Sequence, residues 1–327
     1  MKRIKWSHKI LCLALAALFL CLSLVGCQKR ENGKNGQIVC TSFAAYDWIR
    51  AILGDSETLS VSLLVSSGAD LHSYQPTVAD KVKLSESEMV VYIGGESDAW
   101  VGEWLAQASG VRAVCLSEIE GVTLRNVSEH GDGEGEAHLH EEGEEHAHAS
   151  FDEHIWLSPK NAAVLTAYLA QELAKIDEEN AALYRGNAEA YQTELALLGE
   201  AYAEMVAASQ NRRVIVADRF PFVYLVEEYG ISYCAAFAGC TTENEAGFET
   251  VVRLSRQADE WEARYLLVTE SSDRKLAGSV IAATKDKNQE ILSMNSMQAI
   301  SSERIDSGVS YLSLMYENLD ILRKALS

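Results

Sequence analysis

The sequence is short of positive charge and lacks the motifs of several large protein classes. It has 28 lysines and arginines against 48 aspartates and glutamates, which gives a net charge of −20. This excess argues against nucleic acid and against an acidic substrate as the partner. No C-x-x-C pair is present, so a zinc site built from cysteines is not expected. The H-E-x-x-H, G-x-S-x-G and P-loop patterns are missing as well, so no motif supports an enzyme.

The N-terminus has the pattern of an export signal. A basic segment at residues 2–9 precedes a mostly apolar run over 10–25, which is short for a membrane span and typical of a signal peptide. The run ends in Leu24-Val25-Gly26-Cys27, which resembles the bacterial lipobox, whose cysteine is lipidated. We therefore expect a signal peptide over 1–26, a lipid on Cys27 and a polar tether over 27–37. The alternative is a plain signal peptide with an incidental cysteine.

Short apolar runs and helical patterns alternate along the rest of the chain. This alternation predicts parallel βα units and an α/β fold with two lobes. We expect an N-terminal lobe over 38–127 and 151–177, and a C-terminal lobe over 210–327. One long helix over 178–209, with a single apolar stripe, is expected to join them. The strands are predicted at 38–43, 59–65, 89–93, 111–116, 213–217, 231–236, 265–269 and 290–294.

Residues 128–150 are rich in histidine and acid. Between residues 129 and 148 the chain has five histidines, eight carboxylates and four glycines, with two alanines and one leucine as its only apolar residues. Such a segment cannot bury a core, so a mobile loop is expected. Imidazoles among carboxylates can gather a divalent transition metal. The alternative is a solvated acidic linker. The candidate accessory ligands are His130, His138, His140, His146 and His148.

Two further histidines lie in ordered surroundings. His72 follows the predicted strand at 59–65, in the kind of loop where open α/β sheets place their ligands. His154 comes directly after the histidine-rich loop and before an apolar segment. We interpret this pair as fixed metal ligands beside a flexible collector.

The segments around both histidines resemble a known family. The sequence GADLHSYQPT at 68–77 and the sequence DEHIWLSPKN at 152–161 resemble the ligand segments of the zinc/manganese solute-binding proteins of bacterial ABC importers, the cluster A-I family. The histidine-rich insertion resembles the zinc-type branch, and residues 311–326 resemble the closing helix. The resemblance covers residues 38–327.

The resemblance implies a function without catalysis. It implies a monomeric receptor that captures Zn²⁺, or Mn²⁺, between two lobes and delivers it to an ABC permease. The lipid would anchor the receptor to the outer face of the bacterial cytoplasmic membrane. Two imidazoles with one or two carboxylates suit zinc, whereas the sequence leaves the choice between zinc and manganese open.

The second lobe departs from the family pattern. The position where the family has a third histidine or a glutamate falls on Arg219, which is donor-only and cannot bind a metal. Asp218 and Glu270 are the candidate replacements, although Glu270 can equally be a cap or an ion-pair partner of Arg219. A late acidic position of the family falls on Asn295, whose amide oxygen is a weak ligand.

Two other functions remain open. A surface metal-buffering protein or adhesin on the same scaffold would bind metal but would not support uptake. A secreted metallohydrolase would need an activated water and a general base beside the metal. Uptake under metal limitation tests the first alternative, and hydrolytic assays with zinc test the second.

Overall fold

The computed structural model describes residues 36–65, 68–108, 110–126, 151–237 and 247–327. Gly36–Ser327 form one compact unit. The expected signal peptide, Cys27 and the five histidines of the acidic loop lie outside the described residues. Within the described ranges, no helix combines the length and the apolar character needed to cross a membrane.

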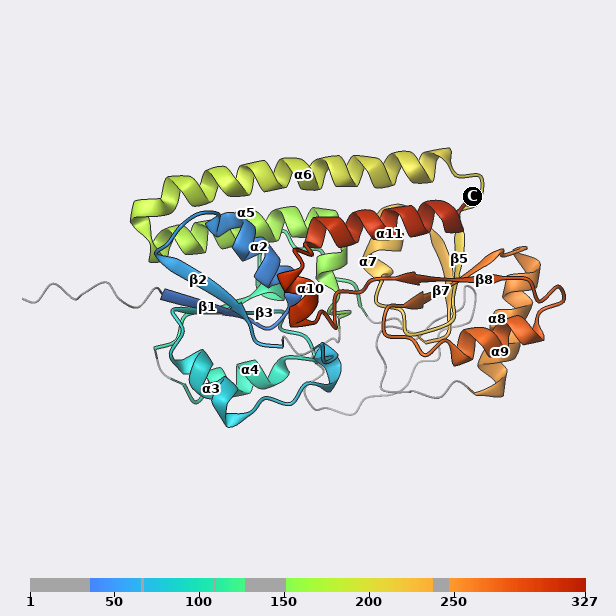
Figure 1. The fold of residues 1–327 in the computed structure, drawn as a ribbon, viewed down its shortest axis with the longest axis horizontal. Helices are drawn as coiled ribbons and strands as arrows, with labels where there is room; N and C mark the ends of the chain where they lie inside the picture. The colour runs from blue at the N-terminus through green and yellow to red at the C-terminus, as the bar shows by residue number, and fades with distance from the viewer. Residues whose placement is uncertain (1–35, 66–67, 109, 127–150, 238–246) are drawn as a thin grey trace, which may run out of the picture. The chain divides into compact units, whose positions relative to one another are not determined.

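Two four-stranded sheets, each with all strands parallel, form the centre of the structure (Figure 1). The predicted α/β fold with two parallel sheets is confirmed. The order is β2-β1-β3-β4 in the first sheet and β6-β5-β7-β8 in the second. The strands are β1 (Gly36–Cys40), β2 (Leu59–Leu63), β3 (Met89–Tyr92), β4 (Ala113–Cys115), β5 (Arg213–Val216), β6 (Ser232–Ala235), β7 (Tyr265–Thr269) and β8 (Glu290–Met294).

Helices cover the sheets and connect successive strands. Parallel strands need such crossovers, and strands covered on both faces read as apolar runs. The helices are α2 (Phe43–Leu53), α3 (Val78–Ser85), α4 (Ala99–Leu105), α5 (Pro159–Ile176), α6 (Ala181–Ala208), α7 (Val223–Glu228), α8 (Phe248–Glu260), α9 (Lys275–Ala283), α10 (Ser302–Asp306) and α11 (Tyr311–Ala325). The sequence predicted all eight of these strands to within a few residues.

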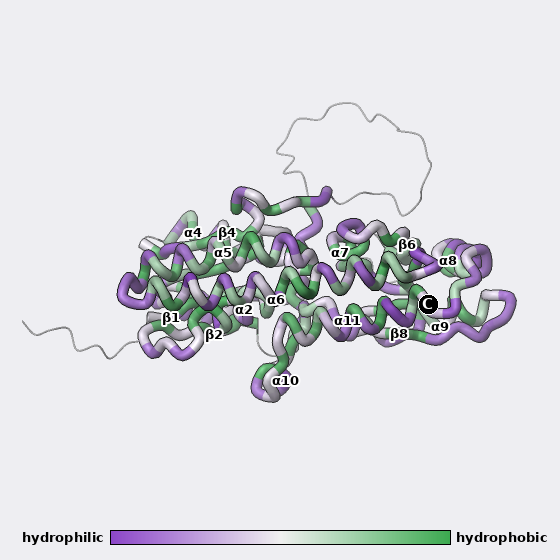
Figure 2. The backbone as a smooth tube through the Cα atoms, turned by 90° about the horizontal axis from the view of Figure 1, so that it is seen from above, coloured by the Kyte–Doolittle hydropathy of each residue, from purple (hydrophilic) through white to green (hydrophobic). Residues whose placement is uncertain are grey.

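The 28-residue helix α6 lies within the range predicted for the linking helix. At about 1.5 Å per residue it is about 42 Å long. It packs against α2 and α5 of the half that contains the first sheet. It also packs against α11, which lies on β7 and β8 of the second sheet (Figure 1). Hydrophobic and hydrophilic residues alternate along α6 in Figure 2, as an amphipathic helix requires. The buried Tyr202 hydroxyl donates to the Met315 carbonyl over 2.7 Å and ties α6 to α11.

One apolar core includes side chains from both sheets. Val39 and Val91 of the first sheet belong to the same cluster as Val216 and Leu267 of the second. A smaller cluster lies under α8 and α9. Trp156, which is 1% exposed, connects the halves by donating from Nε1 to the Ser296 carbonyl over 2.9 Å. This shared core lets loops from both sheets contribute to one site.

Candidate metal site

Most residues of the candidate site follow the carboxyl ends of strands, where open α/β sheets bind their ligands. Parallel strands place these ends on one edge of each sheet, so loops that are distant in sequence meet there. His72 follows β2, Ser97 follows β3, Asp218 and Arg219 follow β5, Glu270 follows β7, and Gln298 follows β8. His154 lies in the segment that leads into α5.

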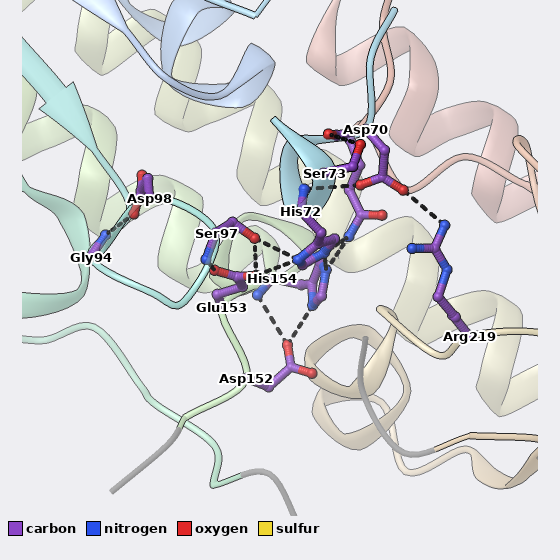
Figure 3. A network of polar contacts seen from close by, with 11 residues as sticks. Asp70, His72, Ser73, Gly94, Ser97, Asp98, Asp152, Glu153, His154 and Arg219 are labelled. Carbon is purple, nitrogen blue, oxygen red and sulfur yellow. Dashed lines mark hydrogen bonds and ion pairs between the residues drawn. The ribbon is translucent and has the colours of Figure 1, made fainter. Parts of the chain in front are cut away.

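The structure brings His72 and His154 together (Figure 3). Their Nε2 atoms are 3.3 Å apart and their ring centroids 5.4 Å apart. His72 lies on a 3₁₀ turn, Leu71–Ser73, whose N-cap is Asp70. His154 immediately precedes another 3₁₀ turn, Ile155–Leu157, and is only 1% exposed.

Asp152 holds the His154 ring. Its Oδ1 lies 2.8 Å from His154 Nδ1 and also accepts the His154 backbone N–H over 3.0 Å. The Asp152 backbone is itself fixed, because its N–H donates to the Arg125 carbonyl and its carbonyl accepts from the Tyr224 hydroxyl. A carboxylate on Nδ1 sets both the orientation and the tautomer of an imidazole. The His154 ring is therefore oriented with Nε2 towards His72.

Glu153 and Ser97 hold the His72 ring. Glu153 Oε1 lies 2.8 Å from His72 Nδ1, and Ser97 Oγ lies 2.5 Å from the same nitrogen. The Ser97 backbone N–H donates to Glu153 Oε2 over 2.9 Å. A Cβ at Gly95 would lie 2.3 Å from Glu153 Oε2, so only glycine permits this close approach.

Glu153 is ionised in this environment. Burial opposes ionisation, but the hydrogen bond to His72, the charge that His72 and His154 carry when protonated, and the Ser97 hydroxyl outweigh it and lower the pKa of Glu153 to about 2. Figure 3 shows Glu153 and Ser97 on one side of the imidazoles, and Asp70 and Arg219 on the other.

The imidazole pair has the geometry of two metal ligands. With both Nδ1 atoms directed at carboxylates, neutral imidazoles present their Nε2 lone pairs where the two rings meet. Tetrahedral zinc with Zn–N distances of about 2.0–2.1 Å places two ligand nitrogens about 3.4 Å apart. The 3.3 Å between the two Nε2 atoms matches this separation.

Gln298 is a site residue that the sequence reasoning missed. Its amide nitrogen lies 2.9 Å from His72 Nε2 and also contacts His154 Nε2. Asn295, on which the family's acidic position was placed, instead uses its Oδ1 to accept the Met297 backbone N–H over 2.9 Å. The only signal for Gln298 in the sequence is its place in the loop after β8.

The two predicted carboxylate ligands make other contacts. Asp218 Oδ1 accepts the Arg219 N–H over 2.8 Å, and Oδ2 accepts the N–H and hydroxyl of Thr269. Both oxygens of Glu270 accept from Ser296, over 2.8 Å each. Among the residues with described positions, no group of three or more His, Cys, Asp or Glu side chains is arranged to hold a metal ion. Ligation by Asp218 or Glu270 stays a prediction.

Arg219 contacts the turn that bears His72. Its guanidinium donates to Asp70 Oδ2 over 2.8 Å, and the two side chains are 24% and 20% exposed. The sequence had suggested Glu270 as an alternative ion-pair partner of Arg219. The structure instead joins a residue after β5 to a residue after β2.

Comparison with known families identifies what this architecture resembles. Residues 38–325 match the family described as "ZnuA: Zinc-uptake complex component A periplasmic". The zinc-binding lipoprotein AdcA of Streptococcus pneumoniae is 27% identical over 322 residues, which cover 96% of this chain but only 60% of AdcA. The high-affinity zinc uptake system protein ZnuA of Bacillus subtilis is 26% identical, with 98% of each chain covered.

Solved structures share the fold. The Zn(II)-bound ZnuA-like domain of Streptococcus pneumoniae AdcA superposes with a TM-score of 0.71 at 22% identity, covering 90% of this chain and 99% of that domain. The laminin-binding protein Lmb of Streptococcus agalactiae, described as a bifunctional protein with adhesin and metal-transporting activity, gives a TM-score of 0.73 at 20% identity. This superposition covers 89% of this chain and 100% of Lmb.

The low pKa of Glu153 predicts a specific acid sensitivity. A pKa lowered from 4.5 to about 2 corresponds to about 3 kcal/mol of folding free energy at most. Because the folded-state pKa lies below the unfolded one, this contribution is present above pH 4.5 and is lost as the pH falls towards 2. The free-energy difference between wild type and Glu153→Gln should therefore shrink by up to that amount between about pH 5 and pH 2.

Urea unfolding at several pH values measures this difference. Glu120→Gln, at an exposed glutamate, is the control and should follow the wild-type curve at every pH. Parallel wild-type and Glu153→Gln curves would show that the ionised Glu153 does not stabilise the fold.

Proposed function

This chain belongs to the family of periplasmic A components of zinc-uptake complexes, and on that premise we propose that it is an extracytoplasmic receptor that captures Zn²⁺ between its two lobes. The relatives named above are binding and uptake components, not enzymes. The receptor would hand its ion to an ABC permease.

The facing imidazoles are the observation that supports this proposal most directly. Nitrogen ligands 3.3 Å apart, each held by a carboxylate on its other nitrogen, match the separation and the outer hydrogen bonds of a zinc site. Imidazole favours zinc over manganese, which prefers oxygen ligands. We therefore assign Zn²⁺ as the cargo, with His72 and His154 as its nitrogen ligands.

Gln298 is proposed as the third contact. A half-turn of its amide exchanges nitrogen and oxygen and would present Oε1 to a cation bound by the two imidazoles. An amide oxygen is a neutral and weak ligand, which suits a receptor that must release its ion. Water, Asp218 or Glu270 would complete the coordination, the last two after giving up their present hydrogen bonds.

The histidine-rich loop is proposed to act before the fixed site. Its five histidines and eight carboxylates would bind zinc weakly and exchangeably, so that the local concentration of the ion rises near the tight site. The loop would then affect the rate of capture more than the affinity of the tight site.

Removing both imidazoles should abolish tight binding. We expect the wild type to bind one Zn²⁺ tightly and Mn²⁺ more weakly, because two neutral nitrogen ligands favour zinc. His72→Ala/His154→Ala should lose the tight site, leaving only weak sites on the loop. Competition with a chromophoric chelator measures both affinities.

A variant lacking residues 129–148 is the control for this experiment. It should keep the tight site and lose only weak binding. Retention of the tight site in the double alanine variant, or its loss in the loop deletion, would contradict the assignment of ligands.

The charge of residue 298 should tune the affinity. Gln298→Glu adds a negative charge next to a divalent cation and is expected to tighten zinc binding by about tenfold or more. Gln298→Leu removes the amide at similar size and should weaken binding by about tenfold. Gln171→Glu, on the exposed face of α5, is the charge-matched control. If the wild type and these three variants bind zinc with equal affinity, Gln298 does not contact the ion.

Delivery to a permease is tested in cells. A strain without this gene should grow poorly under zinc limitation, and the wild-type gene should restore growth and ⁶⁵Zn uptake. His72→Ala/His154→Ala should not restore them. Cys27→Ser tests the lipid anchor, because loss of the anchor should release the protein from the membrane and reduce uptake.

Adhesion is the second candidate function, favoured by the structural likeness to Lmb. An adhesin or metal buffer on this scaffold would bind zinc as described, yet its deletion would leave zinc uptake unchanged. The same uptake measurement therefore separates the two functions.

A further inference from the structure

We propose that Arg219 is a positioning residue for the metal site, acting through Asp70 on the turn that bears His72. This inference rests on the proposed zinc-binding function. It gives a role to the arginine that stands at the carboxyl end of β5, a residue that cannot itself bind a cation.

The two carboxylate oxygens of Asp70 have separate partners. Oδ1 accepts the backbone N–H of His72 over 3.0 Å and so caps the 3₁₀ turn at Leu71–Ser73. Oδ2 accepts from the Arg219 guanidinium over 2.8 Å. One rigid carboxylate thus connects the His72 backbone with the second lobe. Movement of Arg219 would rotate this carboxylate and disturb the turn.

Arg219 is anchored on its own side as well. Its backbone N–H donates to Asp218 Oδ1, while Asp218 Oδ2 accepts from both the N–H and the hydroxyl of Thr269 at the end of β7. Hydrogen bonds therefore run without a break from β7 through Asp218, Arg219 and Asp70 to His72. In this arrangement Asp218 supports the site by holding the Arg219 backbone.

The contact is suited to such a role. Charge-assisted hydrogen bonds between guanidinium and carboxylate are short and strong, and these two side chains are mostly shielded from solvent. The C-terminal sheet would in this way orient an imidazole that belongs to the N-terminal lobe, while Glu153 and Ser97 orient the same ring from within that lobe.

The sign of one mutational effect separates positioning from simple electrostatics. A positive charge near a cation site repels the ion, so charge alone predicts that Arg219→Gln tightens zinc binding. Positioning predicts the opposite, because the His72 turn loses its support. Loss of groups that orient a metal ligand typically weakens binding 10- to 100-fold. For Arg219, one contact further away, we expect about a tenfold loss.

A double-mutant cycle tests the path through Asp70. Zinc affinity is measured by chelator competition for the wild type, Arg219→Gln, Asp70→Asn and the double variant. If Arg219 acts through Asp70, each single variant binds zinc with lower affinity than the wild type. The affinity of the double variant is then no lower than that of the single variant that binds less tightly. Arg219→Lys keeps the positive charge but loses the planar guanidinium. Its zinc affinity should lie between those of the wild type and Arg219→Gln.

Controls keep the outcome interpretable. Arg213→Gln removes the same charge from an exposed arginine on β5, which contacts Asn211 and the Trp261 ring, and should leave affinity unchanged. Circular dichroism and thermal unfolding establish that each variant is folded. Tighter or unchanged binding in folded Arg219→Gln would overturn the proposal, as would additive losses in the double variant.

Failure of this inference is distinguishable from failure of the proposed function. If His72→Ala/His154→Ala abolishes tight binding while Arg219→Gln has no effect, only the role of Arg219 is wrong. If the histidine variant binds zinc as the wild type does, the metal site itself is wrong.

Discussion

The site depends on two buried carboxylates that hold two imidazoles with their Nε2 atoms 3.3 Å apart. Asp152 and Glu153 are 5% and 6% exposed, and burying an unpaired charge to this extent costs several kcal/mol. Each is stabilised instead by hydrogen bonds to a histidine ring and to at least one backbone N–H. Their charge lies behind the ligands, so the ring nitrogens that face each other can share a cation.

The parallel topology determines where this pair can form. Both sheets have the same strand order, with the first strand of each next to the third, and segments that follow the carboxyl ends of their strands contribute His72, Ser97, Arg219 and Gln298. Antiparallel pairing would have sent alternate loops to the opposite edge. The shared apolar core and the α6–α11 contact hold the two sheets together. Gln298 of one half can therefore reach His72 of the other, and Arg219 can reach Asp70.

The C-terminal half contributes to the site in an unexpected way. Its described contacts with the two imidazoles and with the turn that bears His72 come from a neutral amide and from a cation paired with Asp70. The carboxylates of Asp218 and Glu270 accept hydrogen bonds within their own half. By these contacts the C-terminal half would orient and cover the imidazoles, and it would contribute little negative charge to attract the ion. Release to a permease would be easier from a site of this kind than from one closed by ionised ligands.

Local patterns in the sequence predicted the strands and singled out His72 and His154, whose Nε2 atoms the structure places 3.3 Å apart. Short buried runs and helical spacings depend on neighbouring residues, and both histidines lie in short sequence segments that resemble those of a known family. The contacts of Gln298, Arg219 and Asp218 were decided only by the tertiary structure. Gln298 contacts histidines 226 and 144 residues away, and Arg219 pairs with an aspartate 149 residues away. No local pattern encodes such contacts, because they depend on how the two sheets pack around one core.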